Sequence, residues 1–245
     1  DREYQQKKGI SFMKEENKNG QLPEKEQLLS SLRNAEEMYV FMSLCTKMPY
    51  VLCDEETFDD EVLLYYTEED AQREGKKLIE QRIPIQIAKI EKKQLLGFFS
   101  SLYPMGVNGL LINNNMESEA RLQLGELVIR PNTEDLPDGK VWVENPQLHL
   151  TALYFMQEMR RQEKPELTEE LKGLQEEILV NYGRGRFIVA VHKENGMPML
   201  KQKNGDAYQP IFTDILEFRK FNKEDQFKTM AIEAKNVPKM LQEKK

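Results

Sequence analysis

The residues Val-Leu-Leu-Tyr-Tyr-Thr-Glu-Glu-Asp-Ala (62–71) join a strand directly to a helix. The first six are mainly apolar or aromatic and too few for a buried helix, which predicts a buried strand. Thr67 can cap the first turn of a helix, and the carboxylates that follow it are stabilised at the positive end of the helix dipole. We therefore expect a strand over 62–67 and a helix from Glu68 to about Gln81.

The segments on either side continue this alternation. The hydrophobic spacing predicts further strands over 38–45, 50–53, 84–90 and 109–113, and further helices over 23–36 and 91–102. Two strand–helix–strand crossings in succession favour a sheet with a parallel portion, covered by helices. The predicted fold class is α/β, with a mixed α+β sheet.

A different pattern occupies residues 119–163. A short strand candidate at 126–130 is followed by a turn-rich segment at 131–139 and by 140–144, which contains Trp142. The simple interpretation is a hairpin between two larger units. Apolar residues at helical spacing then predict a connecting helix over about 146–161.

The rest of the chain repeats the first part. A predicted helix at 167–180, a strand at 186–191, a strand at 197–200 and Pro-Ile-Phe-Thr at 210–213 follow the same order, and Asp214 starts another helix. Phe187 stands 147 residues after Val40, Thr213 stands 146 after Thr67, and Leu241 stands 146 after Leu95. The agreement predicts two tandem related units, each a short mixed sheet covered by helices. The second unit is incomplete at its C-terminus, because its last predicted strand is missing.

These patterns give four segments. We expect a mobile N-terminal arm at 1–21, a first unit at 22–118, the hairpin and connecting helix at 119–163, and the truncated second unit at 164–245.

Three matching segments make this chain resemble the family of the enhanced serine sensitivity protein SseB. They are Leu-Leu-Tyr-Tyr-Thr-Glu-Glu-Asp-Ala (63–71), Gly-Leu-Leu-Ile-Asn-Asn (109–114) and Pro-Ile-Phe-Thr (210–213). The chain departs from the family at Asn114, where the family has an Asn-Pro-x-Gly turn. The resemblance implies tandem SseB-like domains in a bacterial cytoplasmic protein that is not an enzyme and acts through protein contacts.

Composition excludes several classes of function. The chain has 245 residues, a net charge of -7, two cysteines and two histidines. An acidic chain is poorly suited to binding nucleic acid, which relies on Lys and Arg against phosphates. Two cysteines cannot build a disulfide framework or a four-thiolate zinc site. The sequence contains no run of 18–20 apolar residues that would suggest a membrane span. We therefore expect a cytoplasmic protein without a membrane partner. We also expect no cofactor.

Most chemically suggestive groups have an ordinary structural interpretation. The acidic loop at 54–61 lacks the spacing of a calcium loop and is interpreted as a solvated hairpin loop. Cys45 and Cys53 are interpreted as small buried residues rather than a redox pair, and Gly-Arg-Gly-Arg (183–186) as a flexible lead into a strand rather than an anion site. A metal or acid–base role for His149 and His192 is not favoured, because no third ligand is near in sequence.

One place remains for a ligand. In open α/β sheets ligands bind beyond the carboxyl ends of strands, and five candidate binding residues are predicted there: Thr67, Glu68, Asn113, Asn114 and Thr213. Thr67 and Thr213 are also predicted helix caps. The leading hypothesis is a non-enzymatic protein that binds another protein. The alternatives are a small-molecule sensor or enzyme around Thr67 and Asn113, and self-association through the incomplete second sheet.

Overall fold

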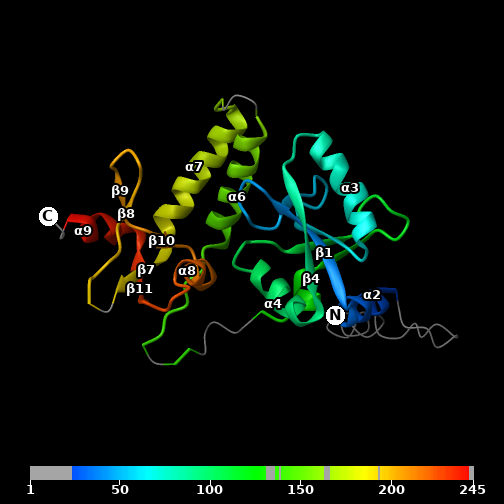
Figure 1. Ribbon diagram of the computed structural model, residues 1–245, viewed down its shortest axis with the longest axis horizontal. Coiled ribbons are helices and arrows are strands. Elements are labelled where there is room, and N and C mark those ends of the chain that lie inside the picture. The colour runs from blue at the N-terminus through cyan, green and yellow to red at the C-terminus, as the bar shows by residue number, and fades with distance from the viewer. Residues whose placement is uncertain (1–23, 131–135, 138, 163–165, 193, 243–245) are drawn as a thin grey trace, which may run out of the picture. The chain divides into compact units, whose positions relative to one another are not determined.

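The computed structural model describes residues 24–130, 136–137, 139–162, 166–192 and 194–242 (Figure 1). The predicted arm at 1–21 lies outside these residues. Helix α2 (Glu24–Asn34) forms within the predicted span of 23–36 and belongs to a different unit from the elements that follow. All elements described below belong to the second compact unit, residues 37–245.

The first sheet of that unit is mixed, which confirms the predicted fold class. Its strands run in the order β4-β1-β3-β5-β6, and β2 pairs with β3. They are β1 (Glu37–Ser43), β2 (Val51–Cys53), β3 (Asp60–Tyr65), β4 (Ile85–Glu91), β5 (Gly109–Ile112) and β6 (Ala120–Gln123). β3 and β5 are parallel, whereas the other pairs are antiparallel.

Two helices cover opposite faces of this sheet. Side chains alternate along a strand, so Phe41 and Met42 of β1 point to different faces. Phe41 packs in a cluster with Ala71 of helix α3 (Glu68–Glu80). Met42 instead lines a cavity together with Phe98 of helix α4 (Lys92–Leu102). The cavity therefore lies on the α4 side of the sheet.

The segment after the first sheet differs from the predicted hairpin. The strand candidate at 126–130 is wrong, because Leu124–Leu127 form the short helix α5, whose capping box joins Gln123 and Glu126. Residues 140–144 form no strand either. Residues 131–135 and 138, on which the rest of the hairpin prediction falls, are outside the described chain.

Two long helices follow. Helix α6 (Pro146–Arg161) matches the predicted connecting helix, and α7 (Glu169–Arg184) lies beside it (Figure 1). Helix α7 runs four residues past its predicted end at 180 and stops at its C-cap, Gly185, where a Cβ would lie 2.7 Å from the Phe187 ring and 2.8 Å from Asn145 Oδ1. Gly-Arg-Gly-Arg (183–186) is therefore a helix end and the start of a strand, not a flexible lead.

The second sheet has three strands in the order β10-β7-β11. They are β7 (Arg186–His192), β10 (Ile211–Phe212) and β11 (Phe227–Glu233), all antiparallel. The sequence did not indicate β11, which alternates poorly and exposes four successive residues. The remaining elements are β8 (Leu200–Lys201) paired with β9 (Ala207–Tyr208), α8 (Ile215–Phe221), the 3-10 turn η1 (Ala234–Asn236) and α9 (Val237–Gln242).

Both sheets place their first strand between two strands that follow it in the chain. β1 lies between β3 and β4, and β7 lies between β10 and β11. When the helix caps Thr67 and Asp214 are aligned, Tyr65 becomes equivalent to Phe212. Tyr65 pairs with Tyr39 across its sheet and Phe212 pairs with Ile188, so Tyr39 is equivalent to Ile188, an offset of 149 residues. The pairing of Val40 with Phe187 in the sequence comparison is therefore wrong by two positions. The boundaries of the predicted tandem units stay a prediction.

None of the described helices is both long enough and apolar enough to cross a lipid bilayer.

Candidate functional site

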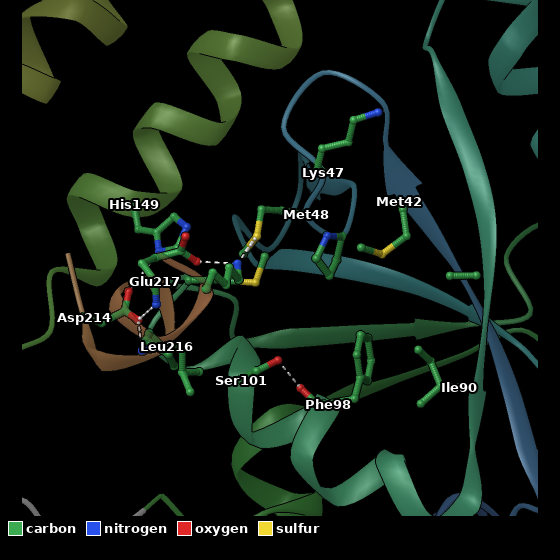
Figure 2. A pocket seen from close by; sticks show the side chains of 15 residues that line it. Met42, Lys47, Met48, Ile90, Phe98, Ser101, His149, Asp214, Leu216 and Glu217 are labelled. Atoms are coloured by element: carbon green, nitrogen blue, oxygen red, sulfur yellow. Dashed lines mark hydrogen bonds and ion pairs between the residues drawn. The ribbon is translucent and has the colours of Figure 1, made fainter. Parts of the chain in front are cut away.

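A cavity of about 250 Å³ lies between the α4 face of the first sheet and helices α6 and α8 (Figure 2). Its walls are largely apolar and include three methionines. Residues on these walls are Met42, Met48, Ile90, Phe98, Met105 and Leu216. Four polar residues gather at one end: His149, Asp214, Glu217 and Lys220. The site is thus an apolar pocket with a compact polar end.

Local sequence explains how His149 reaches the cavity. Pro146 opens α6, where its fixed φ suits the first turn, and the His149 N–H donates to Asn145 O at 2.9 Å. Gly106 adopts a φ of +86°, and a Cβ there would lie 2.6 Å from Pro146 O. Glycine at 106 therefore allows the end of α4 to approach the start of α6.

Asp214 is placed by its role as the cap of α8. Its Oδ1 accepts the N–H groups of Leu216 and Glu217 at 2.8 and 3.0 Å. Its Oδ2 accepts the Thr213 hydroxyl at 2.8 Å and lies 3.5 Å from His149 Nδ1. One carboxylate oxygen thus holds the helix, while the other faces the imidazole.

The charge state of Asp214 follows from these contacts. Burial alone would raise the pKa of Asp214, but His149, the Glu217 N–H and the Thr213 hydroxyl together hold it below its ordinary value. His149 is only 9% exposed, and within the described residues its Nδ1 has no hydrogen-bond partner. The polar end therefore combines a buried anionic carboxylate with an imidazole nitrogen that faces it at 3.5 Å without forming a hydrogen bond.

Lys220 closes the polar end from the surface. Its Nζ donates to Glu217 Oε1 at 2.6 Å and to Met48 Sδ at 2.8 Å (Figure 2). The Lys220 side chain is 53% exposed, so its ammonium can leave these partners at modest cost.

This arrangement suits cation binding better than nucleophilic catalysis. Ser101 also lines the cavity, but its hydroxyl donates to Phe98 O at 2.6 Å within α4. No hydrogen bond between Ser101 and His149 occurs in the part of the chain that the structure describes. Among those residues, one group of three His, Cys, Asp or Glu side chains could hold a metal ion: His149, Asp214 and Glu217.

Two of the predicted site residues, Asn113 and Thr67, lie just after the parallel strands β5 and β3 of the first sheet. Asn113 Oδ1 accepts the Tyr66 N–H at 3.4 Å, and its Nδ2 donates to Ser118 Oγ at 3.0 Å. Thr67 follows Tyr66 in the chain and caps α3, as predicted, by accepting the Asp70 N–H. These contacts are structural, and neither this cavity nor the larger one described below is lined by Thr67 or Asn113.

The other predicted site residues lie apart from the cavities. The Glu68 carboxylate accepts from Gln72 on the surface of α3, and Asn114 is half-buried in the turn after β5. Thr213 follows β10 in the second sheet. The prediction that Thr213 caps a helix is wrong, because Asp214 is the N-cap, and the Thr213 hydroxyl instead supports its carboxylate.

The acidic loop is a hairpin turn between β2 and β3, as predicted. Asp54 Oδ1 accepts from Glu56 and Thr57 within the loop, and Asp59 accepts from Asn108 and Gln123. The carboxylates of Asp54 and Asp59 therefore accept hydrogen bonds from the protein itself and hold the loop in place.

The cysteines and the second histidine have simple surroundings. Cys45 and Cys53 are both free thiols, but the prediction that they are buried is wrong, since Cys45 is half-buried and Cys53 exposed. His192 ends β7, where its Nδ1 accepts the N–H groups of Glu194 and Asn195 at 3.1 Å. The structure does not bring His192 into the cluster around His149.

Sequence reasoning missed the cluster at His149, Asp214 and Glu217. The sequence did carry one signal, the helix start at Asp214. An N-cap residue lies close to the third residue of its helix, so this start places Asp214 and Glu217 next to each other. Their meeting with His149, 65 residues earlier than Asp214, depends on how α6 packs and has no signature in the sequence.

A second cavity of about 760 Å³ shares Ser101, Pro104, Asp214 and Leu216 with the first. Trp142 lines it, and the Trp142 Nε1–H has no hydrogen-bond partner in the described residues. Lys140 and Arg219 also line this cavity.

Comparisons with known proteins give only distant likenesses. No model of a known protein family matches the sequence, and no curated protein sequence matches it. Tic22 from Plasmodium falciparum is similar in structure, with 15% identity and a TM-score of 0.23 over 86% of this chain and 84% of that one. Anabaena Tic22, a protein-transport protein, has 10% identity and a TM-score of 0.23 over 91% and 87%.

Proposed function

We propose that this protein is a non-enzymatic, cytoplasmic interaction module that binds an extended segment of a partner protein along the outer edge of β11. The observation that supports the proposal is the character of this edge. β11 exposes Lys228, Thr229, Met230 and Ala231 in succession, and within the described residues no strand pairs with its outer side. A free edge whose exposed residues include an uncharged run, here Thr229, Met230 and Ala231, is a template for a further strand.

The corresponding strand of the first sheet makes a useful contrast. β4 is also an edge strand, but its exposed residues, Gln86, Lys89 and Glu91, are all polar or charged. Lys89 is tied to Glu37 of β1 at 2.9 Å. Charged side chains on an edge oppose further pairing. The two long edge strands of the described chain each carry one Lys and one Glu, but β11 also exposes the uncharged run Thr229, Met230 and Ala231 and is therefore better suited to strand addition.

The experiment compares two lysine substitutions in the full chain. Met230→Lys places a charge on the β11 edge, and Leu179→Lys places one on the exposed surface of α7, where Leu179 is 64% exposed. We expect a protein partner isolated with the native chain to be retained by Leu179→Lys and lost by Met230→Lys, with unchanged urea midpoints. Equal retention by both variants would exclude the β11 edge as the binding surface.

Self-association through the same edge gives a different result. Sedimentation at several concentrations then shows a dimer of the native chain that Met230→Lys dissociates, with no other protein needed. That outcome would replace the partner protein with a second copy of this chain.

A second function, the binding of a small molecule, is favoured by the larger cavity rather than by the strand ends at Thr67 and Asn113. The free Trp142 Nε1–H, with Lys140 and Arg219 nearby, suits a flat ligand that carries hydrogen-bond acceptors and negative charge. Native mass spectrometry of the chain purified from its own cells tests this function. A stoichiometric small molecule that Trp142→Phe releases would favour it over the interaction module.

A further inference from the structure

We propose that the His149 imidazole and the carboxylates of Asp214 and Glu217 bind one divalent transition-metal ion of the zinc class. The three side chains come from two helices that the fold brings together, α6 and the start of α8. One ligand atom from each lies within 4.8 Å of those from the other two. This site is independent of the β11 edge and of the proposed binding of a protein partner.

The separations suit a small ion. Zinc binds imidazole nitrogen and carboxylate oxygen at about 2.0–2.2 Å in tetrahedral sites, which places neighbouring ligand atoms about 3.3–3.6 Å apart. His149 Nδ1 and Asp214 Oδ2 already stand 3.5 Å apart. Glu217 offers the third ligand atom within 4.8 Å of the other two, and its backbone N–H is held by the Asp214 cap.

The burial of the imidazole supplies a second reason. A polar atom buried without a hydrogen bond is destabilising unless something else occupies it. His149 is nine-tenths buried, and its Nδ1 has no hydrogen-bond partner among the described residues. Figure 2 shows the ring beside Glu217 and facing the same polar end as Asp214. A metal ion at this position would satisfy the nitrogen and both carboxylates at once.

The donor set selects the class of metal. Calcium and magnesium take oxygen ligands, whereas one imidazole with two carboxylates suits zinc and its first-row neighbours. Three protein ligands leave one position open for water or for another ligand. The apolar walls at Met42, Phe98 and Leu216 limit the water that competes for the ion.

Lys220 would compete with the metal ion for the Glu217 carboxylate. Its ammonium lies 2.6 Å from Glu217 Oε1 and so supplies a positive charge to the carboxylate that the metal would use. Because the Lys220 side chain is half-exposed, a divalent ion can displace it. Removing this charge should therefore strengthen metal binding, a result that a merely structural cluster would not give.

The test is zinc binding by the metal-free full chain, followed by calorimetric titration and by metal content after dialysis. We expect one zinc ion per chain. Glu217→Gln and Asp214→Asn should each weaken binding at least about tenfold, as loss of a ligand charge does. Asn is as good an N-cap as Asp, so Asp214→Asn keeps the start of α8 intact. Lys220→Gln should strengthen binding several-fold.

Two matched controls separate this site from adventitious binding. His192→Ala removes the other histidine of the chain and should leave the zinc affinity unchanged. Cys53→Ser removes the exposed thiol and should also have no effect. The proposal is overturned if the native chain binds no zinc, if binding survives in the Asp214→Asn/Glu217→Gln double variant, or if Cys53→Ser abolishes it. Circular dichroism of each variant shows that the fold is retained.

Discussion

The Tyr154 hydroxyl donates a hydrogen bond of 2.5 Å to Asp60 Oδ1, and these residues stand 94 positions apart in the chain. Tyr154 lies in the middle of α6, and Asp60 begins β3 in the first sheet. Burial raises the pKa of Asp60, and the Tyr154 hydroxyl partly opposes that effect. The contact therefore holds a helix against a sheet through a carboxylate that is partly removed from water.

Tyr154→Phe removes this bond and little else. Because hydrogen bonds to charged groups contribute about 1.5–3 kcal/mol, we expect the free energy of unfolding to fall by about 1.5 kcal/mol at neutral pH. Urea denaturation measures the change. Tyr208→Phe, which removes an exposed Tyr–Asp hydrogen bond of 3.3 Å, is the control and should change stability by less than about 0.5 kcal/mol. Equal losses in both variants would contradict the assignment.

Gln157 on α6 acts as a partner for the backbone of β2. Its Nε2 donates to Val51 O at 3.0 Å, and its Oε1 accepts the Val51 N–H at 3.3 Å. Gln157→Ala leaves two buried backbone groups without partners, so we expect a loss of about 2–4 kcal/mol. Gln72→Ala on the exposed face of α3 is the matched control. Hydrogen exchange at the Val51 amide should accelerate only in the Gln157 variant.

Glu61 and Glu74 should respond to pH in opposite directions. Burial raises the pKa of Glu61, although Arg121 opposes the shift. A raised folded-state pKa means that the native state binds protons more readily than the unfolded state, so this group destabilises the fold as pH rises above its unfolded value of about 4.3. Glu61→Gln should therefore gain stability relative to the native chain between pH 4 and pH 7.

Glu74 provides the opposite case. Burial would raise its pKa, but hydrogen bonds from Lys77, Asn115 and Arg73 outweigh burial and hold it below the ordinary value. Its contribution is present above the unfolded pKa and is lost as pH falls through the folded one. Glu74→Gln should thus be less stable than the native chain above about pH 4.3, and this difference should shrink as the pH falls below that value. Urea midpoints at several pH values check both variants, and parallel curves would refute the two assignments.

Asn113 combines a left-handed backbone with two side-chain hydrogen bonds. Its φ is +50°, which glycine tolerates and alanine does not. Asn113→Gly should lose the bonds to Tyr66 and Ser118 alone, and Asn113→Ala should lose a further 1 kcal/mol or so from backbone strain. Thermal unfolding distinguishes them. If alanine proved no worse than glycine, the positive φ would not matter to stability.

Much of the fold can be predicted from local pattern. Alternating and continuous apolar runs indicate β1, β3, β4 and β7, and Thr67 marks the start of α3, because each of these signals lies within one element. β11 escapes prediction because its residues are exposed and do not alternate. The strand predicted at 126–130 is wrong because the capping box at Gln123 and Glu126 stabilises a helix of only four residues, too short to show helical periodicity.

The candidate site is harder to predict than the fold. Asp214 and Glu217 lie on one short helix, and the sequence shows both. His149 joins them only through the packing of α6, which depends on Gly106 and on contacts between residues far apart in sequence. Thr67 and Asn113 do follow the parallel strands β3 and β5, yet their polar atoms are engaged by neighbouring residues of the chain.

Helix α6 contacts both sheets of its compact unit. Tyr154 and Gln157 bind β3 and β2, while Asn145, which precedes the helix, donates to the carbonyls of Arg186 and Thr213 at 2.7 Å. Because both sheets form hydrogen bonds with this helix or with the residue before it, neither sheet can unfold without removing the contacts at one end of α6. Calorimetry should accordingly show residues 37–242 losing their order in a single heat-absorption peak, with equal van't Hoff and calorimetric enthalpies.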